Sequence, residues 1–212
     1  MAIDYRAESL GRYLDDAAAA RPTPGGGSVA AVVGALAATM AAMAAGFTAG
    51  KERFKDVEPE INEHLSRLAE VREGLVEAAH DDMAAYQGIM AAFRMPKETQ
   101  EQQSARGEAV REATRASLDV VGDVREAALE VLTIARRLAD IANPNLVSDV
   151  GVAAELALGT VRAVQVNTAV NLAGYADGVD AAAVREETDT AVAEAERLAA
   201  ETREIVMAKL NG

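Results

Sequence analysis

The stretch that decides the fold is long, apolar and built from small side chains: Ser28–Thr48 reads SVAAVVGALAATMAAMAAGFT. Its length is enough to cross a bilayer. Alanine and glycine, however, contribute little transfer free energy, and few Leu, Ile or Phe residues accompany them. Small side chains also let neighbouring helix backbones approach closely. The stretch is therefore predicted to be the buried central helix of a bundle, with no membrane association.

The rest of the 212-residue chain shows helical periodicity and no convincing strand. Pro-, Gly- or Asn-rich turns separate the helical segments, with Ser28 and Ser148 as predicted N-caps and a bend expected at Gly122. Residues 1–212 are predicted to form one all-α domain, an up-and-down bundle of about six helices. The expected helices cover about 4–19, 28–50, 56–94, 98–141, 148–175 and 180–209.

The chain has a net charge of −13 and no cysteines. Strong acidity argues against nucleic-acid binding, which needs a basic surface. The lack of cysteine excludes disulfide scaffolds and thiolate metal sites. His64 and His80 lie in charged stretches without a second ligand at metal spacing, so both are interpreted as surface residues and no metal is expected.

Two further expectations concern location and charge. Residues Met1–Leu14 lack the basic and apolar regions of a signal peptide, so a cytoplasmic location is expected. Lys51, Arg53 and Lys55 form a local basic group in this acidic chain. An anionic ligand would have to be attracted by a few such cations against the overall field.

Three consecutive glycines, Gly25, Gly26 and Gly27, precede Ser28. Glycines leave backbone N–H groups unobstructed, and the N-terminus of a helix favours an anion. No strand precedes the segment, so it is not a dinucleotide-binding fingerprint. An ordinary interhelix turn explains the segment equally well.

Polar side chains gather in two later segments. Residues Asn143–Asp149 crowd the start of the fifth expected helix, and capping accounts for the serine and the aspartate better than for the two asparagines. Asn167 and Asn171 lie four residues apart in an apolar helix and share one face. Buried amides need hydrogen-bond partners, so interhelix bonding or recognition of a polar heterocycle would explain them.

Asp82 is a carboxylate in an apolar stretch of the sequence. It stands four residues before Tyr86, amid Met83, Ile89 and Met90. Partial desolvation would raise its pKa and let it exchange protons near neutrality. A solvated surface aspartate is the alternative, and no Ser-His-Asp arrangement is visible.

Together these segments resemble the cyclodeaminase/cyclohydrolase family, which comprises the cyclodeaminase part of formiminotransferase-cyclodeaminase and free-standing methenyltetrahydrofolate cyclohydrolases. The resemblance covers nearly the whole chain in the family's order. Two positions depart from the family pattern. Relatives usually have Gly where this chain has Ala142, and Pro-Leu where it has Val121–Gly122. The matching segments are Pro22–Ser28, Gly50–Lys51 with Phe54, Asp82–Tyr86, Phe93–Lys97, Arg106, Asn143–Asp149, and Asn167 with Asn171.

The resemblance implies an all-α homodimer that hydrolyses 5,10-methenyltetrahydrofolate to 10-formyltetrahydrofolate, with the folate as substrate and no cofactor. Ring closure of 5-formiminotetrahydrofolate with loss of ammonia is the alternative, and a non-catalytic folate-binding or scaffold protein is the alternative of another class. Both reactions need a proton carrier and a group that stabilises a cationic iminium. The catalytic candidates are Asp82, Asp149 and Lys51, and the substrate-binding candidates are Gly25, Gly26, Gly27, Ser28, Arg106, Asn143, Asn145, Ser148, Asn167 and Asn171.

Helix lengths sort these candidates into two groups. If the helices alternate in direction, Lys51 lies about 34 Å from Ser28, and Asp82 returns to the level of the glycines, where Arg106 is expected to pair with it. The groups are too far apart to close on one small reacting group, so a site shared between the antiparallel subunits of a two-fold dimer is predicted. The Gly-rich end comprises Gly25–Ser28, Asp82, Arg106, Asn167 and Asn171; the Lys51 end comprises Lys51, Asn143, Asn145, Ser148 and Asp149.

Overall fold

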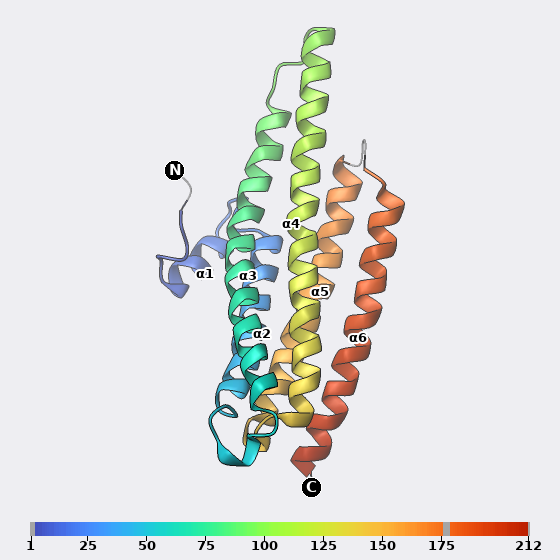
Figure 1. Cartoon of the computed structure of the whole chain (residues 1–212). Coiled ribbons are helices and arrows are strands. Elements are labelled where there is room, and N and C mark those ends of the chain that lie inside the picture. The colour runs from blue at the N-terminus through green and yellow to red at the C-terminus, as the bar shows by residue number, and fades with distance from the viewer. Residues whose placement is uncertain (1–2, 176–178, 212) are drawn as a thin grey trace.

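The computed structural model describes residues 3–175 and 179–211, in which six α-helices and two short 3-10 helices occur and no strand. The prediction of an all-α bundle of about six helices is confirmed (Figure 1). In chain order the elements are α1 (Leu10–Ala18), α2 (Gly26–Gly46), η1 (Glu52–Phe54), α3 (Glu58–Phe93), α4 (Gln100–Ile141), η2 (Pro144–Leu146), α5 (Val147–Tyr175) and α6 (Ala181–Asn211).

The alanine-rich helix α2 is the centre of the packing, against α3, α5 and α4. A Cβ added at Gly34 would lie only 3.2 Å from the side chains of Leu75 and Thr160, on α3 and α5. Small side chains permit this close approach. Among the described residues, α2 alone is long and apolar enough to span a membrane, and half of its most apolar window is buried in the bundle. The prediction of a central core helix is confirmed.

Several predicted helix ends are wrong. Helix α2 begins at Gly26 with Gly25 as its N-cap, a position that glycine tolerates well, so Ser28 lies inside the first turn. Ser148 likewise lies inside α5, because η2 leads directly into that helix. Helix α4 continues through Gly122 to Ile141 without a break. The first helix starts at Leu10, where the hydroxyl of Ser9 caps it, rather than near residue 4.

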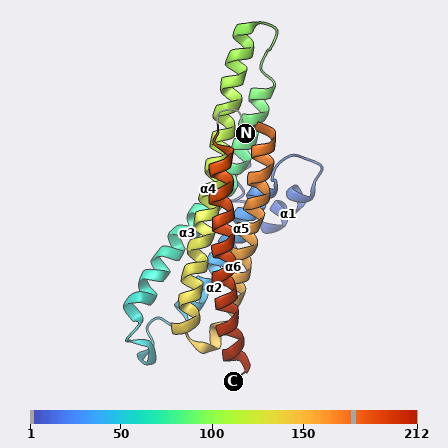
Figure 2. The ribbon, with the colours of Figure 1, turned by 90° about the vertical axis from the view of Figure 1, so that its right-hand side faces the viewer.

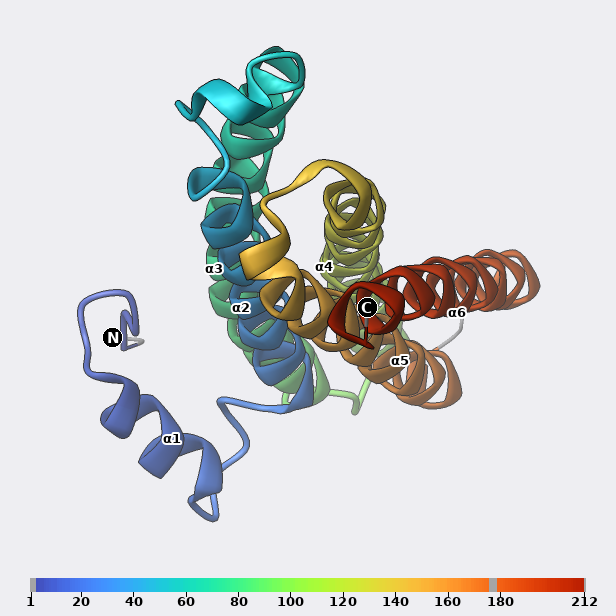
Figure 3. The same ribbon diagram turned by 90° about the horizontal axis from the view of Figure 1, so that it is seen from below.

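The helices differ in how far they extend. The α3–α4 hairpin projects beyond the other helices at one end of the molecule (Figures 1 and 2). At the opposite end, the connections that carry η1 and η2 lie side by side (Figure 1). Helix α1 stands beside the bundle, next to α2 and α3, rather than inside it (Figure 3).

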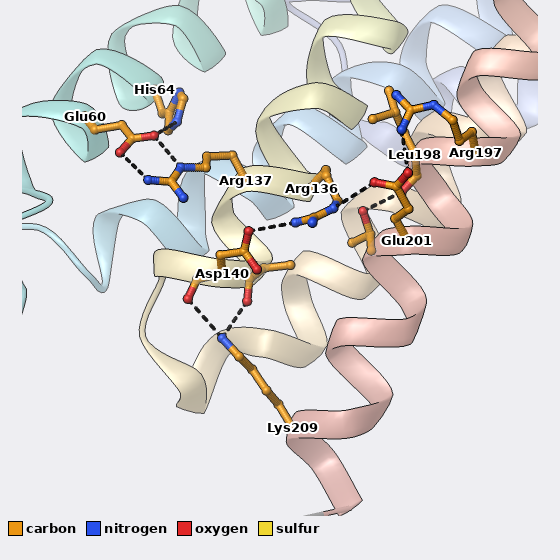
Figure 4. A network of polar contacts seen from close by, with 11 residues as sticks. Glu60, His64, Arg136, Arg137, Asp140, Arg197, Leu198, Glu201 and Lys209 are labelled. Carbon is orange, nitrogen blue, oxygen red and sulfur yellow. Dashed lines mark hydrogen bonds and ion pairs between the residues drawn. The ribbon is translucent and has the colours of Figure 1, made fainter.

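Ion pairs fix the end of α4 that leads into η2 (Figure 4). Arg137 donates to both carboxylate oxygens of Glu60 on α3, at 2.6 and 2.9 Å, and Arg136 donates to Glu201 on α6 at 3.1 Å. The ammonium of Lys209 donates to the carbonyl oxygens of Ala139 and Asp140, where a cation complements the helix dipole. These contacts join the end of α4, and the Asn143 loop that follows it, to α3 and α6.

Candidate active site

The Gly-rich end is built by close contact between the first turn of α2 and Asp82 on α3. The backbone N–H of Ser28 donates to Oδ2 of Asp82 at 2.9 Å. A Cβ at Gly27 would lie 2.0 Å from Oδ1 of the same carboxylate, a distance that no side chain tolerates. Glycine at position 27 is therefore required for Asp82 to approach the helix, and the prediction that Asp82 returns to this turn is confirmed.

The Asp82 carboxyl is partly desolvated, as its sequence context predicts. Burial raises the pKa of Asp82 above its usual range, and the hydrogen bond from the Ser28 N–H opposes this effect. Its side chain remains partly exposed to solvent. A carboxyl with a raised pKa holds a proton more readily than an ordinary aspartate, which suits a group that takes a proton and returns it.

Tyr13 of α1 belongs to the same end and was not among the candidates. Its buried hydroxyl lies 3.0 Å from the hydroxyl of Ser28, and either oxygen can be the donor. Ser28 thus contacts Asp82 through its backbone and Tyr13 through its side chain. In the sequence, Tyr13 is an apolar residue of an amphipathic helix, so no local signal distinguishes it from a core residue.

The two asparagines of α5 have different surroundings. Oδ1 of Asn167 lies 3.2 Å from the position that a Cβ of Gly26 would take, so this amide faces the glycine turn. Asn171, one turn further, donates from Nδ2 to the hydroxyl of Ser117 on α4 at 2.9 Å. Asn167 is therefore placed to meet a ligand, whereas Asn171 joins two helices.

Arg106 does not pair with Asp82. Its Nε donates to the carbonyl oxygen of Phe93 at 3.3 Å, and its guanidinium lies 5.2 Å from the centre of the Phe93 ring. Phe93 is the last residue of α3, where C-terminal carbonyls attract cations. The expected partnership rested on helix rise alone and ignored this competing acceptor.

At the Lys51 end, buried hydrogen bonds join the α2–η1 segment to the loop that follows α4. The hydroxyl of the buried Thr48 accepts the backbone N–H of Asn143 at 2.9 Å. The Asn143 amide donates to the carbonyl of Phe47 at 3.4 Å and accepts the N–H of Asn145 at 3.2 Å. Asn143 is buried and uses its side chain on the protein, so its geometry suits a positioning residue, while Asn145 is exposed.

Lys51 stands out within the local basic group. Lys55 pairs with Glu52 at 2.7 Å, and Arg53 stacks on the Phe54 ring at 4.3 Å. Lys51 is exposed, lies 5.8 Å from the centre of the Phe47 ring, and has no ion pair with any residue that the structure describes. Its ammonium is therefore available to an incoming anion or a developing negative charge.

Ser148 and Asp149 lie in the first turn of α5, beside that loop. Ser148 is exposed and Asp149 is half-buried. An acidic side chain in the first turn is favoured by the helix dipole, which explains Asp149 without a ligand. Both remain on the surface of the Lys51 end, as the helix arithmetic predicts.

The two ends are far apart within one chain. Helix α2 separates them with 21 residues, which corresponds to about 30 Å. Figure 1 shows the η1 and η2 turns at one end of α2, away from the α1–α2 connection that carries the glycines. One chain therefore does not bring Asp82 and Lys51 onto the same small group.

The acidic and histidine side chains do not suggest a metal site. His64 and His80, expected at the surface, are both partly buried, at 3.6 Å from Glu60 and 3.4 Å from Asp4. Within residues 3–175 and 179–211, no three His, Asp or Glu side chains lie close enough together to hold an ion. The absence of a metal or other cofactor stays a prediction.

The known proteins that are similar to this chain point to one family. The formiminotransferase-cyclodeaminase family model matches residues 9–190. The methenyltetrahydrofolate cyclohydrolase of Methylorubrum extorquens is 33% identical over 96% of this chain and 98% of its own length. The formimidoyltransferase-cyclodeaminase of Rattus norvegicus is 28% identical over 91% of the chain, which spans 36% of that longer protein.

A solved structure supports the same conclusion. The crystal structure of formiminotetrahydrofolate cyclodeaminase from Thermotoga maritima matches with a TM-score of 0.77 and 29% sequence identity, over 98% of each chain. The named relatives are enzymes of folate one-carbon chemistry, and they match over the segments that carry both ends of the candidate site. The chain belongs to the formiminotransferase-cyclodeaminase family of folate enzymes.

Proposed function

We propose that the protein hydrolyses 5,10-methenyltetrahydrofolate to 10-formyltetrahydrofolate. Water adds to the methenyl carbon and loses one proton, which leaves a hydroxyl on that carbon. The hydroxyl then loses its own proton as its oxygen forms the formyl C=O bond, and the bond from the carbon to N5 breaks as N5 gains a proton. The oxygen of water becomes the formyl oxygen, and one proton is released overall. The observation that carries the proposal is the partly desolvated Asp82 carboxyl, held against the N-terminal turn of α2 by the Ser28 N–H.

Asp82 suits both demands of this reaction. As a carboxylate it stabilises the cationic methenyl group and accepts the proton of the attacking water. As a carboxylic acid it returns that proton to N5. The amide of Asn167 supplies a donor and an acceptor for the pterin edge, beside the unobstructed turn at Gly26.

We infer that Lys51 reaches this centre from a second subunit. Apolar residues on the outer face of α2 follow the 4-3-4-3-4 spacing of a coiled-coil seam, and Leu36 and Phe47 are 52% and 54% exposed. Such an exposed apolar stripe is typical of an interface between subunits. The seam consists of Val29, Val33, Leu36, Met40, Met43 and Phe47.

The spacing of the seam is symmetric about its centre, which suits an antiparallel pair of α2 helices around a two-fold axis. Val29 would then pack against Phe47 of the partner subunit, and Leu36 against Met40 of the partner subunit. The same register brings Lys51 of the partner subunit level with Gly25. Its ammonium would stabilise the oxygen that develops on the reacting carbon.

The second candidate reaction is closure of 5-formiminotetrahydrofolate with release of ammonia. The similarity to the cyclodeaminase of Thermotoga maritima favours it, since the match covers nearly the whole of both chains. The reacting carbon and the required proton carrier are alike in the two reactions. In either case we propose a cytoplasmic enzyme that uses the folate as its substrate without a further cofactor.

The test is a direct assay of purified protein with 5,10-methenyltetrahydrofolate, in a buffer that catalyses the hydrolysis only weakly. The decay of the methenyl absorbance should be much faster with wild-type protein than with buffer or with the Asp82→Asn variant. Ammonia release from 5-formiminotetrahydrofolate, measured on the same preparation, separates the two candidate reactions. A wild-type protein that accelerates neither reaction would contradict the proposal.

A further inference from the structure

A groove of about 430 Å³ lies between α1, α2 and α3, and Ser28 of the candidate site lines one part of it. Its volume falls in the usual range of small-molecule pockets, about 300–1,000 Å³. The walls along α2 and α3 are mainly apolar, and the N-terminal segment and α1 form the third side. The lining of the groove includes Ser28, Val32, Arg72, Val76 and Met83.

The groove has a direction that follows from the packing of α2 on α3. Gly27 faces Asp82 and Gly34 faces Leu75, so the two helices run antiparallel and in step. Ser28 and Met83 therefore mark one end of the groove, and Arg72 lies near the other. Eleven residues separate Met83 from Arg72 along α3, a distance of about 16 Å.

The cation at the far end of the groove is Arg72. Arg72 is exposed and has no hydrogen bond or ion pair within the part of the chain that the structure describes. Arg6, the other arginine of the groove, already pairs with Asp4 and Glu77. A free guanidinium at the end of an apolar groove, in a chain of net charge −13, is suited to a carboxylate on a ligand.

Tyrosines close the side of the groove that α1 forms. The rings of Tyr5 and Tyr13 meet edge to face, with centroids 5.2 Å apart. Both are tied down by polar contacts, since Tyr5 donates to the buried Asp16 at 2.9 Å and Tyr13 bonds to Ser28. The groove therefore offers aromatic and aliphatic surface for a flat ring between Ser28 and Arg72.

We propose that this groove binds the p-aminobenzoyl-glutamate part of the folate, with the ring between Val32 and Val76 and a glutamate carboxylate on Arg72. The proposal rests on the proposed function, because it assigns the tail of that same substrate. The reacting carbon stays at the Gly-rich end, and the tail runs along α2 and α3 toward Arg72. Among the described residues that line the groove, one carboxylate occurs, Glu8, and it comes from the α1 side.

The experiment compares two substrates that differ only in the glutamate: 5,10-methenyltetrahydrofolate and the corresponding 5,10-methenyltetrahydropteroate. Arg72→Met should raise KM for the folate about tenfold, which corresponds to about 1.4 kcal/mol, and leave kcat unchanged. The KM for the pteroate should not move. Arg115→Met, at an exposed α4 position outside the groove, is the matched control and should change neither value.

Other outcomes overturn the proposal. An equal rise of KM for both substrates would mean that Arg72 does not contact the glutamate. A shift of Arg72→Met from dimer to monomer in sedimentation would mean that a second copy of the chain fills the groove. If wild-type protein turns over neither substrate, the proposed function fails. Calorimetry with p-aminobenzoyl-glutamate alone then tests whether the groove binds this part of the folate. Binding to wild type but not to Arg72→Met would support it, and no binding would contradict it.

Discussion

The two ends of α2 carry opposite kinds of polar group. At the Lys51 end, Thr48 and Asn143 are buried and satisfied by each other and by the backbone, so they stabilise the fold. At the Gly-rich end, Asp82 is pressed against α2, and burial raises its pKa, so its charged form is disfavoured in the folded state. The comparison indicates that the buried polar pair beside Lys51 stabilises the fold, whereas the Asp82 carboxyl is held ready for reaction at a cost in stability. Substitutions at the two ends should therefore have different effects.

The largest effect is expected at Asp82. Asp82→Asn removes the proton carrier and should lower kcat by about 10²–10⁴. Because folding raises the pKa of this carboxyl, its contribution to stability is present at low pH and is lost as pH rises through the folded-state value. The variant should therefore melt at a higher temperature than wild type at pH 7. Thermal unfolding at neutral and acidic pH checks this, since the difference should disappear in acid, and a variant less stable at pH 7 would contradict it.

A smaller loss of activity is expected at Gly27. Gly27→Ala places a Cβ 2.0 Å from Oδ1 of Asp82, so the carboxylate must move away from the turn. Displacement of a catalytic group by about 1 Å costs about 10²-fold in rate. Gly74→Ala in α3 is the matched control, because a Cβ there meets nothing within 4 Å, and it should stabilise the helix by about 0.5–1 kcal/mol. Equal rates for the two variants would show that Asp82 needs no fixed position.

At the buried Thr48, beside the Lys51 end, the expected effect is on stability. Thr48→Val removes the acceptor of the Asn143 N–H and leaves that buried group unsatisfied, at a cost of about 1–3 kcal/mol in the free energy of unfolding. Thr133→Val removes a similar hydroxyl bond to the preceding turn at an exposed site and should change stability little. Denaturant unfolding of both variants measures the difference. Matching values would mean that the Thr48–Asn143 contact does not anchor the loop.

The sequence predicts which residues lie at the Gly-rich end better than it predicts the contacts that they make. Helix lengths and turn residues are local signals, so arithmetic along α2 and α3 correctly brought Asp82 back to the glycines. Arg106 was misplaced because rise along a helix does not say which way a side chain points or which acceptor competes for it. Tyr13 and Thr48 were missed because their roles depend on partners far away in sequence, and an apolar or small polar residue in a helix carries no mark of that.

The central claim is that Asp82 of one subunit works with Lys51 of the partner subunit. The most direct test mixes two inactive variants, Asp82→Asn and Lys51→Met, after unfolding and refolding them together, and measures the decay of 5,10-methenyltetrahydrofolate. Half of the dimers would be mixed, and each would hold one intact site of two, so a shared site predicts recovery of about a quarter of wild-type activity. Activity that stays at the level of the separate variants, with mixed dimers demonstrably formed, would show that the two residues do not share a site across subunits.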